Sequence, residues 1–404
     1  MDQWPVAPGK IDYLFLTHAH IDHIGRVPEL IDRKFEGEII CSHPTKALLA
    51  PMLTDAMKFS AMSEHTADGI MRSIDDLSWG FEYGETFDLT NGISFKLKRA
   101  GHILGSSFIR VQDDKSGWSI LFSGDLGAAN TPILADPEPP DSADLVVMES
   151  TYGDRRHADR KRRIEQLGAV LTRALADRGR VFIPAFALGR TQELIYEMDR
   201  IFTDPRYCEM FPELRGRQRP PVFVDSPLGL KITRIYARLA EYWDNEARDL
   251  EQRGDHPIDF HGLYAVENHR DHLKLCQSNG PAIILAGSGM CTGGRIIDHL
   301  QNGIEQPEND ILFVGYQAAG TPGRDIQDYA DKPCGYVVLD GERRSINACV
   351  HSLTGYSAHA DQNGLVDWIA SMPEKPGAIK LVHGERQAQT ALADLLRKTG
   401  YSIS

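Results

Sequence analysis

The segment "THAHIDH" at residues 17–23 places three imidazoles and a carboxylate close together, at His18, His20, Asp22 and His23. The run before it, "YLFLT", is apolar and short, which predicts a buried strand, and "IGRVPELIDRK" after it is typical of a helix. The cluster is therefore expected at the turn where a strand ends. Active-site residues of α/β proteins gather at such turns.

A divalent metal is the simplest reason for so many ligand-type side chains in one turn. A single histidine is usually structural, so the grouping carries more weight than any one residue. Polar side chains clustered beside an apolar strand are costly to bury unless something binds them. Imidazole nitrogen and carboxylate oxygen suit zinc, and such a group can share two ions.

Composition narrows the class of protein. A chain of 404 residues can hold two or three domains. No stretch approaches the roughly 20 apolar residues of a membrane span, and the start lacks the pattern of a secretory signal. The six cysteines are scattered without a CxxC pair, which favours a reduced cytoplasm and argues against cysteine-ligated zinc. The net charge of −13 excludes a strongly basic nucleic-acid coat but not a nucleic-acid substrate.

The pattern of elements divides the chain into three zones. In residues 1–155, short strands end near polar residues. In residues 156–344, helices and strands alternate, which predicts an inserted α/β domain with a parallel sheet. In residues 345–404, the pattern of the first zone returns, with strands that end near polar residues. We expect the outer zones to form one domain and a cleft between the two domains to be the substrate site.

More ligand-type residues are expected at strand ends further along the chain. They are His102 in "RAGHILGSS", Asp125 in "LFSGDLG", Glu149 in "VVMESTYGD", His359 in "GYSAHAD" and His383 in "KLVHGER". Each is weak evidence alone. Together they supply the histidines and carboxylates that a two-metal hydrolase needs.

These motifs resemble those of the metallo-β-lactamase superfamily, and within it the β-CASP nucleases that process RNA. "HAHIDH" matches the HxHxDH signature. "IPAFALGRTQELIYEMD", "VDSPLGLKITRIY", "GSGMCTGGR" and "GYQAAGTPGR" resemble the β-CASP domain, and "GYSAHAD" and "LVHGE" its second and third motifs. The nearest likeness is to bacterial members similar to the cleavage-and-polyadenylation factor, without KH domains. The resemblance implies an αββα sandwich with an inserted α/β β-CASP domain that contains a parallel sheet.

The resemblance also implies roles for individual residues. Two Zn²⁺ ions, with Mn²⁺ as an alternative, would have seven ligands: His18, His20 and His102 for the first ion, Asp22, His23 and His383 for the second, and Asp125 bridging. Asp22, Glu149 and His359 are implied in catalysis, with Glu149 and His359 as the acid–base pair. A histidine at position 383 favours RNA over DNA.

The expected reaction is hydrolysis of an RNA phosphodiester by a metal-activated hydroxide, leaving a 5′-phosphate. Cutting inside the RNA and cutting from its 5′ end use the same metals, so the sequence leaves both open. The expected location is the cytoplasm, the expected partner is RNA, and no membrane is involved. A homodimer is an open alternative.

One departure from the family pattern keeps other functions open. Members carry several dozen residues before HxHxDH, which form the first strands and hold an Asp of motif one; this sequence has "MDQWPVAPGKIDYLFL" there. Loss of such a supporting residue costs roughly 10–100-fold in metal affinity or activity. A catalytically impaired RNA-binding protein is therefore one alternative. Another metallo-β-lactamase-fold hydrolase, acting on a thioester or lactam, is a second.

Three arginines follow glycine-rich loops in the inserted domain: Arg190, Arg295 and Arg324. A cation at a helix N-terminus is disfavoured by the helix dipole, and a bound anion would remove the conflict. We expect these arginines to contact RNA phosphates, with salt bridges to carboxylates as the alternative.

The histidines of "HGLYAVENHRDH" fit no zinc signature, so a surface or structural role is expected for His261, His269 and His272. The same expectation holds for His299.

Overall fold

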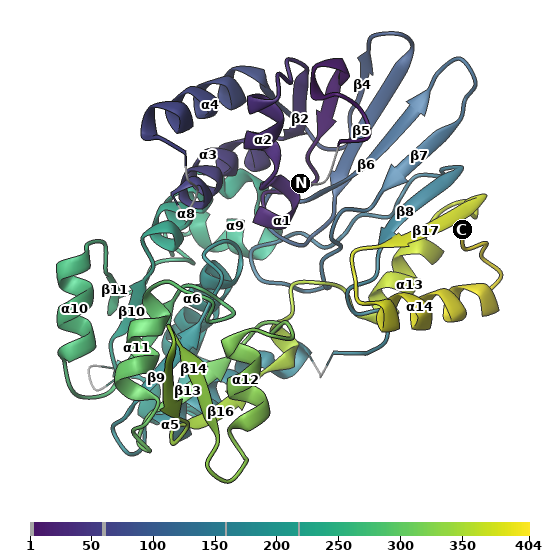
Figure 1. The fold of residues 1–404 in the computed structure, drawn as a ribbon. Coiled ribbons are helices and arrows are strands. Elements are labelled where there is room, and N and C mark those ends of the chain that lie inside the picture. The colour runs from purple at the N-terminus through teal and green to yellow at the C-terminus, as the bar shows by residue number, and fades with distance from the viewer. Residues whose placement is uncertain (1–3, 59–61, 158–159, 217–218) are drawn as a thin grey trace. The chain divides into compact units, whose positions relative to one another are not determined.

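The computed structural model describes residues 4–58, 62–157, 160–216 and 219–404. The chain forms two compact units (Figure 1). The first unit comprises Met1–Arg156, Glu241–Asp244 and His359–Ser404, and the second comprises His157–Ala240 and Asn245–Ala358.

The first unit contains two sheets. A three-stranded parallel sheet has the order β1-β2-β3, and a six-stranded sheet has the order β17-β8-β7-β6-β5-β4. The strands are β1 (Tyr13–Phe15), β2 (Glu38–Ser42), β3 (Ser78–Phe81), β4 (Thr86–Leu89), β5 (Ile93–Arg99), β6 (Ser107–Asp113), β7 (Ser119–Phe122), β8 (Leu145–Glu149) and β17 (Ala378–Val382). The helices are α1 (Ile21–Ile24), α2 (Val27–Asp32), α3 (His43–Met57), α4 (Glu64–Leu77), α13 (Gln362–Ala370) and α14 (Arg386–Lys398).

Alternation along the strands explains the four layers of this unit. Phe95 and Leu97 of β5 point to one side and pack against Ile40 of β2, which joins the two sheets. Val146 and Met148 of β8 belong to a separate core with residues of α13 and α14. On the other side, α3 and α4 contact the three-stranded sheet. The result is the predicted αββα sandwich.

The second unit is built on a six-stranded parallel sheet with the order β11-β10-β12-β9-β13-β16. Its strands are β9 (Arg180–Pro184), β10 (Val222–Asp225), β11 (Leu263–Ala265), β12 (Ala282–Ala286), β13 (Asp310–Phe313) and β16 (Cys349–Ser352), with a separate hairpin of β14 (Tyr336–Leu339) and β15 (Glu342–Ser345). Its helices are α5 (Arg163–Ala174), α6 (Arg190–Thr203), α7 (Pro205–Met210), α8 (Pro227–Arg238), α9 (Asn245–Gln252), α10 (His269–Gln277), α11 (Arg295–Gly303) and α12 (Pro322–Tyr329).

The central strands of this sheet are buried along their whole length. Every residue of β9, β12 and β13 is buried. Parallel strands covered on both faces have such continuous burial, because helices lie on each side of the sheet. The inserted α/β domain with a parallel sheet is thus present.

The end of the second unit differs from the boundary at residue 345 that the sequence pattern suggested. Strand β16 lies after that boundary and pairs with β13 in the parallel sheet. Pairing with β13 places Cys349–Ser352 in the second unit, which extends to Ala358, and the first unit resumes at His359. In the described parts of the chain, no helix combines the length and the apolar character that crossing a membrane requires.

Two glycines of the first unit offer a matched test of this packing. A Cβ at Gly127 would lie 1.9 Å from the Gly101 carbonyl oxygen, whereas a Cβ at Gly69, inside α4, meets no atom within 4 Å. We expect Gly127→Ala to lower the melting temperature, because backbone must move. Gly69→Ala should stabilise the unit by about 0.5–1 kcal/mol, since alanine loses less backbone entropy in a helix. Thermal unfolding followed by circular dichroism measures both, and equal melting temperatures would contradict the close approach at Gly127.

Candidate metal centre

Seven ligand-type side chains of the first unit converge from separate segments. His18 and His20 follow β1, while Asp22 and His23 lie in α1. The others follow strand ends of the six-stranded sheet: His102 after β5, Asp125 after β7 and His383 directly after β17. Strands β5, β7, β8 and β17 run in the same direction, with antiparallel β6 between β5 and β7, so their carboxyl ends lie at one edge of the sheet and residues far apart in the chain meet there.

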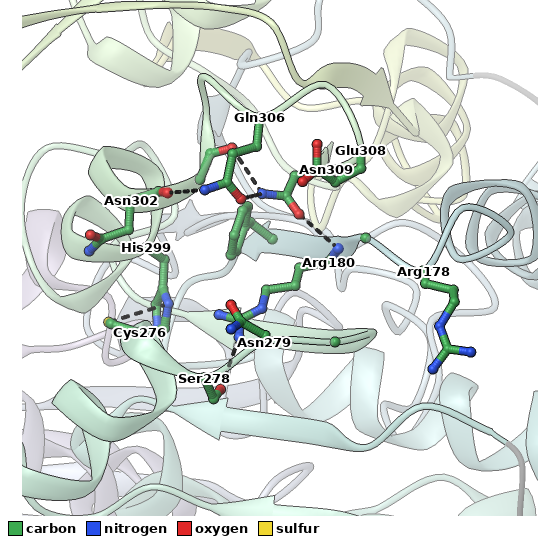
Figure 2. Close-up of a pocket in the computed structure, with 14 residues that line it drawn as sticks. Arg178, Arg180, Cys276, Ser278, Asn279, His299, Asn302, Gln306, Glu308 and Asn309 are labelled. Atoms are coloured by element: carbon green, nitrogen blue, oxygen red, sulfur yellow. Dashed lines mark hydrogen bonds between the residues drawn. The ribbon is translucent and has the colours of Figure 1, made fainter.

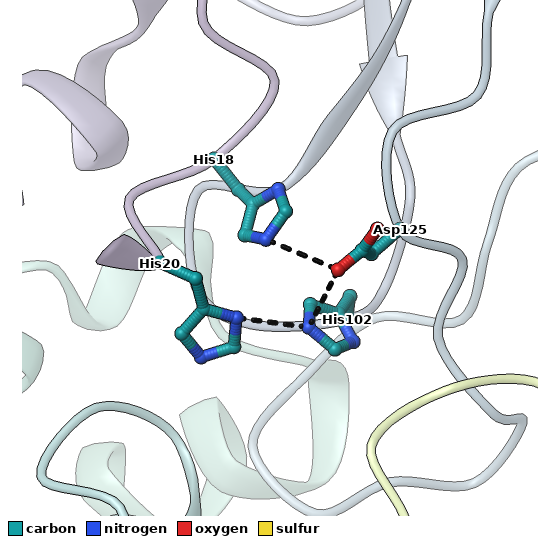
Figure 3. A group of neighbouring side chains, drawn as sticks. All are labelled: His18, His20, His102 and Asp125. Atoms are coloured by element: carbon teal, nitrogen blue, oxygen red, sulfur yellow. Dashed lines mark hydrogen bonds and ion pairs between the residues drawn. The ribbon is translucent and has the colours of Figure 1, made fainter. Parts of the chain in front are cut away.

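The first group consists of His18, His20, His102 and Asp125 (Figure 3). Asp125 Oδ2 lies 3.4 Å from His18 Nε2 and 3.6 Å from His102 Nε2. His20 Nδ1 lies 3.0 Å from His102 Nε2. His18, His102 and Asp125 are almost completely buried.

The second group consists of Asp22, His23 and His383. Asp22 Oδ2 lies 3.5 Å from His23 Nε2 and 3.3 Å from His383 Nε2. Asp125 also touches this group, since its Oδ2 is 3.3 Å from His23 Nε2 and its Oδ1 is 3.5 Å from His383 Nδ1. One buried carboxylate is therefore shared between both groups.

These separations fit donors arranged around ions. Two donors each about 2.1 Å from one tetrahedral zinc lie about 3.4 Å apart, close to most of the distances above. Among the described residues, several buried polar atoms here have no hydrogen-bond partner: His18 Nε2, His23 Nε2, His102 Nδ1 and Asp125 Oδ1. Unpaired buried polar atoms are costly. Because His18 Nε2, His23 Nε2 and the Asp125 carboxylate face one another, bound cations would satisfy all three side chains. The residues present thus fit a pair of divalent ions.

Protonation in the first group, His18, His20, His102 and Asp125, also matches that of metal ligands, whereas the hydrogen bond with Asp22 raises the pKa of His383 in the second group to about 9. Burial lowers the pKa of His18 and His102 below the ordinary value and lowers that of His20 to about 3. Burial acts to raise the pKa of Asp125, but the close polar contacts with His18 and His23 outweigh it and hold this pKa well below its usual range. Neutral imidazoles around an ionised carboxylate are the forms that bind a divalent metal.

Glu149 and His359 form a third group with Asp125. Glu149 ends β8, is 1% exposed, and accepts a hydrogen bond of 2.6 Å from the Leu126 backbone N–H. His359 Nδ1 lies 3.2 Å from Glu149 Oε1. Burial acts to lower the pKa of His359, but the charge and hydrogen bond of Glu149 outweigh it, so the pKa lies above its ordinary value.

A residue that the sequence did not single out supports His383. Thr151 Oγ1 lies 3.0 Å from His383 Nδ1 and also donates to the His383 carbonyl oxygen. Threonine is common in loops, so no pattern in the sequence predicts this contact. It appears only because β17 and β8 are neighbours.

The three arginines of the glycine-rich loops all have carboxylate partners, which is the alternative that the sequence left open. Arg190 is buried and pairs with Glu193. Arg295 donates to Asp225 Oδ1 at 2.6 Å and to two backbone carbonyls. Arg324 pairs with Asp328 at 2.9 Å, and both side chains are substantially exposed.

The αββα sandwich and its clustered histidines and carboxylates define the class of metal-dependent hydrolases. Family comparisons agree with this class. Residues 1–166 match the metallo-beta-lactamase superfamily, residues 191–326 match the Beta-Casp domain, and residues 343–404 match the Zn-dependent metallo-hydrolase RNA specificity domain.

Full-length relatives extend the match over almost the whole chain. Ribonuclease TTHA0252 of Thermus thermophilus is 35% identical over 98% of this chain and 86% of its own length. Transcription termination factor FttA of Pyrococcus horikoshii is 31% identical, and that of Methanocaldococcus jannaschii 29%. The chain spans 61% of the length of these two FttA proteins. It belongs to the β-CASP metallo-β-lactamase family of RNA nucleases, as the motifs predicted.

A solved structure supports the fold alone. The crystal structure of a protein of unknown function from Enterococcus faecalis has a TM-score of 0.53 and 15% identity over 97% of this chain and 78% of that one.

Replacement of the shared carboxylate tests the metal centre directly. We expect Asp125→Asn to lose about two equivalents of bound zinc, because both donor groups depend on this anion. Its melting temperature should rise less than that of the unmodified protein when zinc is added, since binding to the folded state stabilises it. Elemental analysis and thermal unfolding measure the two effects. Exposed His261, replaced by Ala, is the control, and zinc retained in full by Asp125→Asn would contradict the assignment.

Proposed function

We propose that the protein is a two-zinc ribonuclease that hydrolyses RNA phosphodiester bonds and leaves a 5′-phosphate. The observation that carries this proposal is the sharing of buried Asp125 by two donor groups, with the Glu149–His359 pair beside it. The first ion would be held by His18, His20 and His102, the second by Asp22, His23 and His383, and both by Asp125. When bound, the ions would supply an acidified water and neutralise charge on the phosphate oxygens.

The residues of the chain have separate tasks in this reaction. Buried Asp125 and exposed Asp22 would contribute two negative charges to the ligand set, which would balance part of the charge of the ions. We assign protonation of the leaving group to His359, because the charge and hydrogen bond of Glu149 outweigh burial and raise its pKa above the ordinary value, which favours the protonated ring. Glu149 orients this ring through Nδ1, so that Nε2 is the atom that delivers the proton to the departing ribose oxygen.

RNA is favoured as substrate by the family to which the chain belongs and by the name of its relative, Ribonuclease TTHA0252. A thioester- or lactam-cleaving hydrolase is disfavoured by the inserted β-CASP unit, since a small substrate needs no second domain. A non-catalytic RNA-binding role is disfavoured by the complete set of direct metal ligands, although the motif-one Asp expected of the family has no match in the sequence. We also propose that the protein is located in the cytoplasm and that it can form a homodimer.

Of the three arginines, Arg324 is the one we retain as a phosphate contact. Its pair with Asp328 is exposed, and such a pair contributes only about 0–1 kcal/mol, so a phosphate can replace the carboxylate. Arg190 is buried and pairs with Glu193, and Arg295 donates several hydrogen bonds within the second unit, so neither guanidinium is available to a phosphate.

Removal of the proposed acid separates binding of metal from catalysis. We expect His359→Ala to keep its zinc and lose about 10²–10⁴-fold in turnover, because only the proton transfer is removed. The measurements are elemental analysis and cleavage of 5′-labelled RNA, with product ends identified by mass spectrometry. His65→Ala, at an exposed position in α4, is the control. A parallel loss of zinc in His359→Ala would refute the role of an acid.

Glu149 allows a test by pH dependence. A general acid must be protonated, so kcat/KM falls as the pH rises through the pKa of His359. Glu149→Gln removes the charge that raises this pKa. We therefore expect the alkaline limb of the pH profile to move to lower pH. Glu36→Gln, at an exposed position, should leave the profile unchanged; an alkaline limb that stays in place in Glu149→Gln would show that His359 is not the titrating acid.

A further inference from the structure

A second cluster of ligand-type side chains lies inside the second unit. Asp225 ends β10, His272 and Cys276 lie one turn apart on α10, and His299 lies on α11. Asp225 and His272 are fully buried, and His299 is 1% exposed. Sequence analysis predicted only surface or structural roles for these histidines, because their spacing matches no zinc signature. The fold nevertheless brings donor atoms of His272, Cys276 and His299 within 4.8 Å of one another.

Asp225 controls the orientation of both imidazoles. Its Oδ2 lies 2.6 Å from His272 Nδ1 and 2.6 Å from His299 Nε2, while its Oδ1 accepts from Arg295. A carboxylate that accepts from two rings fixes a proton on these two nitrogens. The opposite nitrogens, His299 Nδ1 and His272 Nε2, are then the ones that can bind a cation. Carboxylates hold metal-binding histidines in this way.

The thiol of Cys276 lies where such a cation would need its third donor. Its Sγ is 3.6 Å from His299 Nδ1 and 3.8 Å from both ring nitrogens of His272. Donors 2.3 Å and about 2.1 Å from one tetrahedral zinc lie about 3.6 Å apart. His299 thus already presents Nδ1, the nitrogen that Asp225 does not hold, toward the sulfur. His272 Nε2 lies 2.8 Å from Asp298, so a cation would have to displace this carboxylate, whose side chain is 47% exposed, to gain the nitrogen as a ligand.

A hydrogen-bonded network without metal explains only part of the cluster. His272 lies between Asp225 at 2.6 Å and Asp298 at 2.8 Å, and as an imidazolium it would satisfy both carboxylates. In this network the thiol makes only weak hydrogen bonds, the shortest to His299 Nδ1 at 3.6 Å. Burial raises the pKa of Cys276 to about 12, so the thiol is not a free nucleophile at neutral pH. A bound metal would remove its proton and make use of the sulfur.

A cavity of about 320 Å³ provides access to this cluster. Its lining includes Cys276 and His299, together with polar side chains such as Asn302. Figure 2 shows Cys276 and His299 side by side at this cavity, joined by a dashed line. An ion held by three protein ligands keeps a fourth position, which a water in the cavity can occupy.

We propose that His272, Cys276 and His299 bind one zinc-class divalent cation, with Asp225 as the carboxylate that orients both imidazoles. The ion would tie α10 to α11 and stabilise the second unit. All three proposed ligands belong to the second unit. Metal binding here is therefore independent of the proposed ribonuclease activity, which we assign to a centre without cysteine.

Cobalt(II) tests the site because a thiolate ligand gives a charge-transfer band in the near ultraviolet, and imidazole and carboxylate ligands do not. The full chain, stripped of metal and titrated with Co²⁺ under reducing conditions, is expected to show this band. Cys276→Ser should abolish it. Cys208→Ser, a half-buried cysteine of the same unit, should keep it, as should the double variant Cys334→Ser/Cys349→Ser, which removes the two exposed thiols.

A second variant covers the case in which Cys276→Ser alters the fold. His299→Gln keeps the thiol, and at cobalt concentrations that saturate the unmodified chain it should show little of the band, with an unchanged circular dichroism spectrum. No thiolate band in the unmodified chain, although cobalt is bound, would overturn the proposal. So would a band of full intensity in Cys276→Ser or in His299→Gln. RNA cleavage is not measured in this experiment. A negative cobalt result would therefore leave the proposed ribonuclease function untouched, and absence of RNA cleavage would leave the proposed cation site untouched.

Discussion

The contact between the buried carboxylate of Asp125 and its surrounding imidazoles is the constraint on which the rest of the first unit depends. An ionised carboxylate under a core is costly unless charge or hydrogen bonds compensate for it. Here the compensation comes from His18, His23 and His102. They reach Asp125 only because β5 and β7 end at the same edge of the six-stranded sheet and β1 of the three-stranded sheet ends beside them. The Asp125 carboxylate can therefore be buried only if the strands are arranged so that these imidazoles surround it.

The buried polar clusters of the two units are stabilised by the same kind of contact, between a carboxylate and several imidazoles. In each, one carboxylate at a strand end holds several imidazoles: Asp125 after β7 in the first unit and Asp225 at the end of β10 in the second. Strand ends are suited to this, because the backbone is fixed by the sheet while the side chain is free to point beyond it. The centres differ in their other donors. The first has oxygen and nitrogen only, whereas the cluster of the second adds sulfur from Cys276.

Much of the fold could be predicted from local patterns. The alternation of Phe95 and Leu97 in β5 and the wholly apolar β12 each point to a strand of a particular kind, one half-buried and one fully buried. Both the αββα sandwich and the inserted parallel sheet followed from such patterns together with the motifs. Local patterns did not place the end of the second unit, since residues after 345 resemble those of the first unit. Pairing of β16 with β13 decides their place, and pairing is not a local property.

The sequence by itself determined the ligand types and their position at strand ends, because "THAHIDH" and the later motifs are short segments whose chemistry is visible in the letters. It also determined the family. Only the tertiary structure decided which donors meet. Arg190 was read as a candidate for binding phosphate, and its partner Glu193 became evident only in the folded helix. His272 and His299 were expected to be surface or structural histidines, and they meet through Asp225, which lies 47 and 74 residues away from them in the chain. Distances between such residues depend on strand order and helix packing, and these arise from burial of the whole core rather than from any one segment.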